Sequence, residues 1–151
     1  MRKRRRSGSI LVILAVLGIA IAGYLAATKL SGEIPVCGPL RGCETVNTSE
    51  YSEIMGVPVA LFGVAYSVVA LVASAFWWWA GDRRALYLLY GMGLLGLLAV
   101  AYLTYLELFV IGAVCVWCVS YGVTVVGGWL TAVFALRASS RATDGAGIPG
   151  T

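Results

Sequence analysis

Four long apolar stretches dominate this chain of 151 residues. They cover residues 10–27, 57–80, 85–111 and 115–136, and the shortest has 18 residues. A helix of about 20 residues crosses the hydrocarbon core of a bilayer. Backbone groups in lipid must be hydrogen-bonded within the structure, and no stretch alternates with the period of a strand. The sequence therefore predicts an all-α membrane protein, a four-transmembrane-helix bundle.

Composition excludes a water-soluble domain. Hydrophobic residues make up 60% of the chain and charged residues 12%, whereas soluble domains are about 45–50% apolar and about 25% charged. The basic residues 1–9 followed by an apolar run resemble a signal peptide, but residues 10–27 exceed the usual apolar region of about 7–15 residues. We expect a retained helix, with the basic cluster setting orientation rather than binding nucleic acid.

Nine of the eleven Lys and Arg residues fall on one predicted side of the membrane, at positions 2–6, 83, 84, 137 and 141. Only Lys29 and Arg41 fall on the other side. Lys and Arg concentrate on the cytoplasmic side of membrane proteins. We therefore expect a multi-pass plasma-membrane protein, with both termini and the polar tail 137–151 cytoplasmic and the loop 28–56 outside.

The four cysteines form two pairs that this orientation places on the outer side. Cys37 and Cys43 lie in the outer loop, and Cys115 and Cys118 lie where the last helix enters the membrane. Disulfides persist in that oxidising compartment. Paired thiols at a membrane surface indicate electron transfer to a bilayer-soluble acceptor. Two alternatives remain: a non-catalytic scaffold with structural disulfides, and a four-thiolate zinc site, for which no nearby His or acid pattern speaks.

The C-V-W-C sequence has a specific geometry on a helix. Positions i and i+3 share a face, so Cys115 and Cys118 can pair. Cys115 begins the helix, where the dipole and free N–H groups favour a thiolate. Cys118 lies one turn deeper. The outer sulfur can thus exchange with another thiol while the inner one meets a hydrophobic oxidant.

The loop pair lies among turn-forming residues, P-V-C-G-P-L-R-G-C. We expect a mobile disulfide that shuttles between an aqueous partner and Cys115, because exchange requires close attack by a thiolate. Our preference is for Cys43 facing the partner and Cys37 attacking Cys115. After this pair, Thr48 or Ser49 is expected to cap a short interfacial helix that ends at Gly56. Ser49 either only caps that helix or orients the reactive thiols.

Glu107 is the one acid inside an apolar run. Carboxylates within a membrane are costly and often functional. Two alternatives stay open: the side chain snorkels to the interface, or it provides a proton route, since reduction of a quinone to a quinol takes two protons.

The cysteine motifs belong to the stretches C-G-P-L-R-G-C-E-T-V-N-T-S and Y-L-E-L-F-V-I-G-A-V-C-V-W-C, with G-V-P-V-A-L-F-G between them. In these stretches the chain resembles the vitamin K epoxide reductase family in its bacterial form. The resemblance implies a membrane thiol-disulfide:quinone oxidoreductase that drives disulfide formation outside the cytoplasm. Electrons would come from a separate DsbA-like or thioredoxin-like protein and pass to a ubiquinone or menaquinone, with no metal.

The resemblance also assigns residues. Cys118 would face the quinone, Cys115 would receive the exchange from the loop, and Ser49 would be the family's loop serine. Phe62 would supply the aromatic position of the second helix and, with Glu107 and Tyr121, line the quinone site.

Two positions depart from the animal enzymes of the family. Val59 stands where those enzymes have an asparagine, and Gly122, beside Tyr121, stands where they have a tyrosine. These departures count against epoxide reduction more than against quinone reduction. A vitamin K quinone or epoxide reductase stays the alternative function. The disulfide-bond-forming B proteins catalyse the same net reaction but carry the two cysteine motifs in the reverse order.

Overall fold

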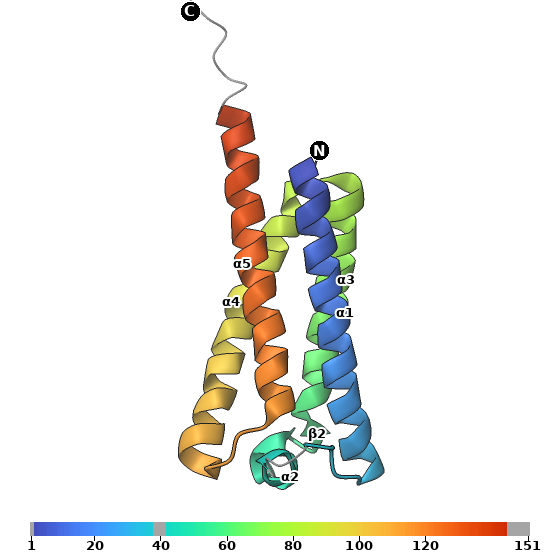
Figure 1. Ribbon diagram of the computed structural model, residues 1–151, viewed down its shortest axis with the longest axis vertical. Coiled ribbons are helices and arrows are strands. Elements are labelled where there is room, and N and C mark those ends of the chain that lie inside the picture. The colour runs from blue at the N-terminus through green and yellow to red at the C-terminus, as the bar shows by residue number, and fades with distance from the viewer. Residues whose placement is uncertain (1, 38–41, 145–151) are drawn as a thin grey trace, which may run out of the picture.

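The computed structural model describes residues 2–37 and 42–144, and it consists mainly of four long helices. These are α1 (Arg2–Ser31), α3 (Val59–Ala80), α4 (Arg83–Tyr105) and α5 (Val116–Asp144), which lie side by side as a bundle (Figure 1). Each contains a segment long and apolar enough to span a membrane. The predicted all-α membrane bundle is confirmed.

Two helices extend beyond the apolar runs. α1 begins at Arg2 rather than at residue 10, and α5 continues to Asp144 rather than to residue 136. Arg and Lys are good helix formers, so the charged ends continue the helices into the aqueous layer. Residues 145–151 of the tail lie outside the described residues, as do the turn-forming residues 38–41 with Arg41.

Small residues bring the helices together at the end that carries the termini. The buried cluster there contains the apolar side chains of Leu11, Ala73, Trp77, Ala85, Leu86, Leu89, Ala132 and Ala135. Gly93 lies against Trp129, so that an added Cβ would come within 2.5 Å of the indole ring. Close packing through small residues is the usual way in which membrane helices associate. This half of the bundle is therefore largely filled by side chains, with a small cavity of about 40 Å³ beside Leu11, Leu89 and Trp129.

The segment between α1 and α3 covers the opposite end of the bundle. It contains α2 (Gly42–Thr48), the 3-10 turn η1 (Glu50–Ser52), and strands β1 (Glu53–Ile54) and β2 (Val57–Pro58), which pair antiparallel. We call residues 42–58 the cap. The prediction of a helix from Thr48 or Ser49 to Gly56 is wrong, because α2 ends at Thr48 and η1 and β1 follow it. Met55 and Gly56 both have positive φ, 54° and 81°, and form the hairpin turn.

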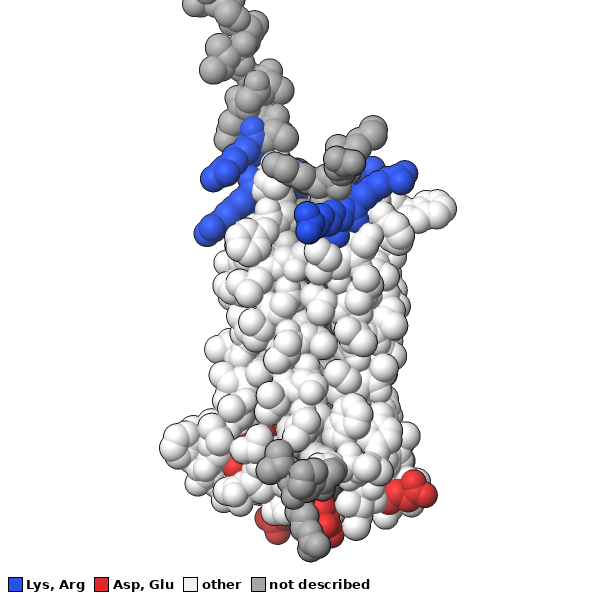
Figure 2. Space-filling view, in the orientation of Figure 1, with Lys and Arg blue, Asp and Glu red and all other residues white. Residues whose placement is uncertain are grey.

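Charge separates the two ends of the molecule, as Figure 2 shows. The described arginines lie at the end that carries the termini, where Asp82 caps α4 by accepting from the Arg84 backbone. Four glutamates, Glu33, Glu44, Glu50 and Glu53, belong to the cap end. Among the described residues of that end, Lys29 is a cation, and it pairs with Glu53 at 3.3 Å. The asymmetry matches the charge pattern expected from the sequence.

Candidate active site

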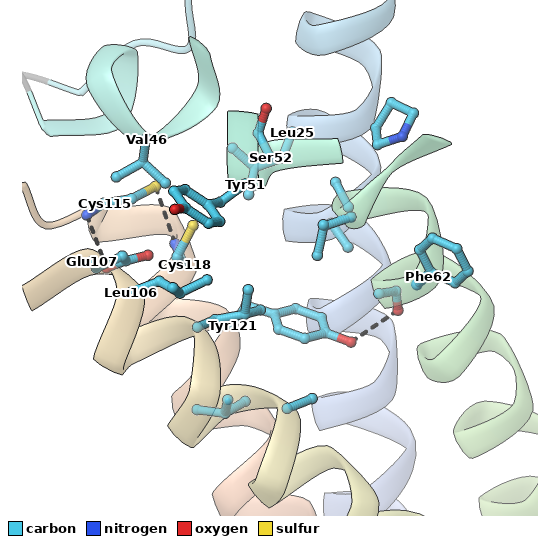
Figure 3. A pocket seen from close by; sticks show the side chains of 18 of the residues that line it. Leu25, Val46, Tyr51, Ser52, Phe62, Leu106, Glu107, Cys115, Cys118 and Tyr121 are labelled. Carbon is cyan, nitrogen blue, oxygen red and sulfur yellow. Dashed lines mark hydrogen bonds between the residues drawn. The ribbon is translucent and has the colours of Figure 1, made fainter. Parts of the chain in front are cut away.

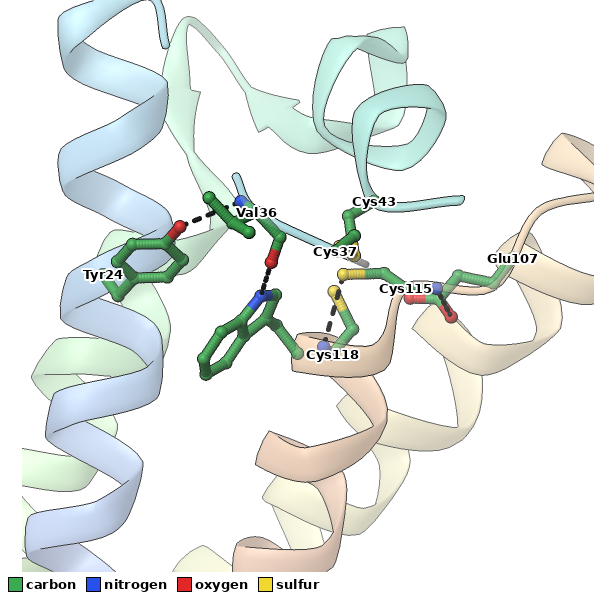
Figure 4. The surroundings of a disulfide bond; sticks show 8 residues. Tyr24, Val36, Cys37, Cys43, Glu107, Cys115 and Cys118 are labelled. Carbon is green, nitrogen blue, oxygen red and sulfur yellow. Dashed lines mark hydrogen bonds between the residues drawn. A yellow bond between two sulfur atoms is a disulfide. The ribbon is translucent and has the colours of Figure 1, made fainter. Parts of the chain in front are cut away.

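All four cysteines meet at the cap end of the bundle (Figure 4). Cys37 and Cys43 form a disulfide with Cα atoms 6.0 Å apart, whereas Cys115 and Cys118 are free. Cys43 is fully buried and Cys115 is 2% exposed, while Cys37 and Cys118 are partly exposed. The disulfide takes up two of the four sulfurs that the zinc alternative requires. The two sequence pairs thus form one cluster of sulfur atoms.

Cys115 occupies the N-cap position of α5. Its carbonyl accepts from the Val119 N–H at 3.0 Å, and its Sγ accepts from the Cys118 N–H at 3.4 Å. Sulfur here takes the place that a Ser or Asp oxygen usually has at a helix start. A hydrogen bond from the Cys118 thiol lowers the pKa of Cys115 below the ordinary cysteine range, against burial, which raises it. The arrangement favours a Cys115 thiolate.

Cys118 lies one helical turn further along α5 and lines a cavity of about 370 Å³ beneath the cap (Figure 3). The walls are mostly apolar and come from α1, α3, α4, α5 and the cap. All of Ser49, Phe62, Glu107, Cys115, Cys118 and Tyr121 contribute to the lining. Largely apolar cavities of roughly 300–1,000 Å³ with a few polar groups suit small organic ligands. The cavity suits the head of a quinone next to a thiol.

Glu107 points inward because the end of α4 changes its winding. Residues Leu106–Ile111 form a π-helix, η2, which ends at Gly112 with φ of 69°. Single-turn π segments often occur at functional sites. Glu107 is 4% exposed, and its Oε2 accepts from the Cys115 N–H at 3.2 Å. It therefore does not snorkel, and its carboxyl joins η2 to the start of α5.

Tyr121 crosses the cavity floor toward α3. Its hydroxyl donates to the Gly63 carbonyl at 2.9 Å and lies 3.2 Å from the Ser67 hydroxyl (Figure 3). The phenol ring packs closely on α3, since an added Cβ at Gly63 would lie 3.4 Å from its outer atoms and 3.3 Å from the Ala22 Cβ. Tyr121 thus supplies a fixed polar group within reach of a ligand in the cavity.

Ser49 and Phe62 line the cavity without a hydrogen bond to a cysteine among the described residues. The Ser49 hydroxyl donates to the Val46 carbonyl at 2.7 Å and makes no cap bond to η1, so capping of a following helix does not explain it. Phe62 is 52% exposed on α3 and lies across the cavity from the cysteines (Figure 3). Phe62 lies away from the sulfur cluster, whereas Glu107 is hydrogen-bonded to Cys115 (Figure 3).

The sequence does not predict the supporting contacts of three residues, Lys29, Tyr24 and Trp117. The Lys29 ammonium donates to the Asn47 carbonyl at 2.6 Å and to the Ser52 hydroxyl at 2.8 Å, which ties α1 to the cap. Tyr24 and Trp117 both bind the backbone of the residue before Cys37. Trp117 was visible as the third letter of C-V-W-C, but nothing local in the sequence connects it with residue 36.

Comparison with known families gives one match over most of the chain. The model of the vitamin K epoxide reductase family matches residues 9–133, a stretch that contains all four cysteines and reaches from α1 into α5. The chain belongs to the vitamin K epoxide reductase family. This membership, expected from the sequence, makes it a membrane thiol-disulfide oxidoreductase of a quinone-linked family rather than a passive scaffold.

Proposed function

We propose that this family member transfers electrons from a DsbA-like or thioredoxin-like protein to a membrane quinone and so forms disulfides outside the cytoplasm. The observation that carries the proposal is the single sulfur cluster. One pair is a disulfide that joins Cys37 to Cys43 of the cap, and the other consists of thiols that line an apolar cavity. Such a cluster links an aqueous donor to an acceptor dissolved in lipid.

The first step occurs at the Cys37–Cys43 disulfide. Burial favours Cys37 as the atom that the partner attacks, since Cys43 is fully buried; this reverses our preference from the sequence. The partner's thiolate forms a mixed disulfide with Cys37 and releases Cys43. The partner's second thiol then displaces Cys37, so the partner leaves as a disulfide and the loop pair holds two electrons.

The second step moves the electrons inward. The Cys43 thiolate attacks Cys115 in a Cys115–Cys118 disulfide and releases Cys118 as a thiolate. Cys37 then attacks Cys43, which re-forms the loop disulfide and frees Cys115. The products are a Cys37–Cys43 disulfide and two inner thiols, the same bonding as in the structure.

The third step is reduction of the quinone. The inner dithiol gives up two electrons and two protons, closes to a disulfide, and leaves a quinol in the bilayer. Cys115 and Cys118 both line the cavity, and Cys118 is the more exposed of the two. Glu107 is the acid beside this pair that can accept and pass on a thiol proton. For a two-electron transfer, each 30 mV of potential difference contributes about 1.4 kcal/mol.

Membrane orientation follows from charge. The arginine-rich end would face the cytoplasm and the cap end the outer compartment of a bacterial plasma membrane. A partner exported to that compartment would then reach Cys37 directly.

Epoxide reduction receives no support from the residues that distinguish the animal enzymes. Val59 lines the cavity with an apolar side chain where an asparagine would offer an amide. Gly122 is buried against Val100, so that position contributes no hydroxyl. Quinone reduction is the better match.

The test uses the purified protein, a reduced thioredoxin-fold donor and a short-chain quinone. Replacing Cys118 by Ala should abolish quinone reduction, because no inner disulfide can form. Val119→Ala, at the neighbouring half-exposed position, is the matched control and should keep normal turnover. Undiminished turnover in the Cys118 variant would contradict the proposal.

A further inference from the structure

The residue before Cys37 is held by two side chains from different helices (Figure 4). The Val36 N–H donates to the Tyr24 hydroxyl of α1 at 2.9 Å, and the Val36 carbonyl accepts from the Trp117 indole of α5 at 2.9 Å. The Val36 side chain itself is 75% exposed. Its backbone is therefore fixed by these two hydrogen bonds and not by burial of the side chain.

The two holding side chains also support each other. The rings of Tyr24 and Trp117 lie 4.9 Å apart at 48°, a separation typical of interacting aromatic pairs. Trp117 stands between Cys115 and Cys118 in the sequence. The position of Cys37 is thus linked through one residue, Val36, to the first turn of α5.

The other cysteine of the loop disulfide, Cys43, lies next to a residue that contacts the segment just before α5. Gly42, the neighbour of Cys43, lies against the backbone of Val114, the neighbour of Cys115. A Cβ at Gly42 would overlap the Val114 carbonyl oxygen. Each loop cysteine is therefore held, through the residue before it, by a residue next to or within the C-V-W-C sequence.

This double attachment does not depend on the disulfide bond. When the loop pair is reduced, the contacts at Val36 and Gly42 remain available to keep its sulfurs beside Cys115. Holding reacting groups in place raises their effective concentration and so speeds exchange. Such holding would restrict the shuttling of the loop disulfide that we expect from the sequence.

We infer that Tyr24 and Trp117 are positioning residues for exchange between the two cysteine pairs, because they hold Val36 and thereby Cys37 and its partner next to Cys115. The inference rests on the proposed function for its electron path. Neither side chain needs to touch a reacting sulfur or the quinone, so the effect should appear in internal exchange alone.

The test measures internal exchange without any quinone. In a Cys43→Ser, Cys118→Ser background, only Cys37 and Cys115 remain, and the equilibrium of their disulfide against glutathione gives their effective concentration. A Cys37→Ser, Cys118→Ser background reports Cys43 and Cys115 in the same way. Trp117→Phe and Tyr24→Phe keep the rings but each remove one hydrogen bond. Each should lower the effective concentration about fivefold, the factor that corresponds to ~1 kcal/mol for a hydrogen bond.

Matched controls separate positioning from general damage. Trp79→Phe and Tyr102→Phe remove the same groups at exposed sites on α3 and α4 and should change nothing. Dithiothreitol can reduce Cys115 and Cys118 directly in a Cys37→Ser, Cys43→Ser background. Quinone reduction by this inner pair should stay normal in the Trp117→Phe and Tyr24→Phe variants.

Unchanged effective concentrations in both the Trp117→Phe and Tyr24→Phe variants would overturn the inference. So would an equal fall in the Trp79→Phe and Tyr102→Phe controls, or an equal fall in the rate of quinone reduction. Failure of the proposed function itself would look different. In that case the Cys118→Ala enzyme would still reduce quinone, whatever the glutathione equilibrium shows.

Discussion

The cysteines of the loop pair are six residues apart in the sequence and those of the inner pair are three apart. Different features of the molecule place the two pairs. Cys115 and Cys118 are placed by helix geometry, with one capping α5 and the other a turn deeper. Cys37 and Cys43 are placed by contacts of Val36 and Gly42 with residues that are distant in the sequence. The comparison teaches that a local motif can fix the terminal electron carrier, whereas the relay that supplies it depends on tertiary packing.

The largest effect on turnover should come from two single variants, Cys43→Ala in the loop pair and Cys118→Ala in the inner pair. Cys43→Ala should lower donor-driven turnover by at least about a thousandfold, as loss of a nucleophile does. The same variant should still reduce quinone when dithiothreitol reduces Cys115 and Cys118 directly. Cys118→Ala should lose both activities. Quinone reduction followed by absorbance with each reductant makes the distinction, and equal behaviour of the two variants would contradict a sequential path.

Glu107→Gln should affect the inner pair alone. The amide can still accept from the Cys115 N–H, but it cannot take up a proton. Loss of a general base lowers rates by about a hundredfold or more. We expect such a fall in the quinone half-reaction, with the glutathione equilibrium of Cys43 and Cys115 unchanged. A normal quinone half-reaction would remove Glu107 from the proton path and leave it an orienting role.

Gly42→Ala should affect the loop pair alone. The new methyl group would meet the Val114 backbone, and such overpacking costs about 1–3 kcal/mol. Internal exchange should fall about tenfold while direct reduction of quinone by the inner pair persists. Gly91→Ala is the control, since a Cβ there meets nothing within 4 Å. Equal losses in both half-reactions would show that the two pairs are not supported independently.

The smallest effect concerns the pH dependence of Cys115. The hydrogen bond from Cys118 lowers the pKa of Cys115, so its thiolate persists to lower pH than that of an ordinary cysteine. Cys118→Ala removes this bond and should raise the midpoint of thiolate formation. The pH dependence of Cys115 modification by methyl methanethiosulfonate, read by mass spectrometry in a Cys37→Ser, Cys43→Ser background, provides the measurement. A midpoint that stays in place or falls would contradict the assigned cause.

Sequence alone determined the bundle and the inner pair. Hydropathy fixes the four helices, because a backbone in lipid must bond within itself. The i, i+3 spacing places Cys118 one turn inside Cys115. These properties depend on residues close together in the chain, and so a single sequence reveals them.

Only tertiary structure decided the cap and its attachments. The hairpin at Met55 and Gly56 replaced an expected helix, the π-helix turned Glu107 inward, and burial distinguished Cys43 from Cys37. The bond from Trp117 to Val36 joins residues 81 positions apart. Such contacts depend on how the helices cross, and no local pattern encodes that crossing.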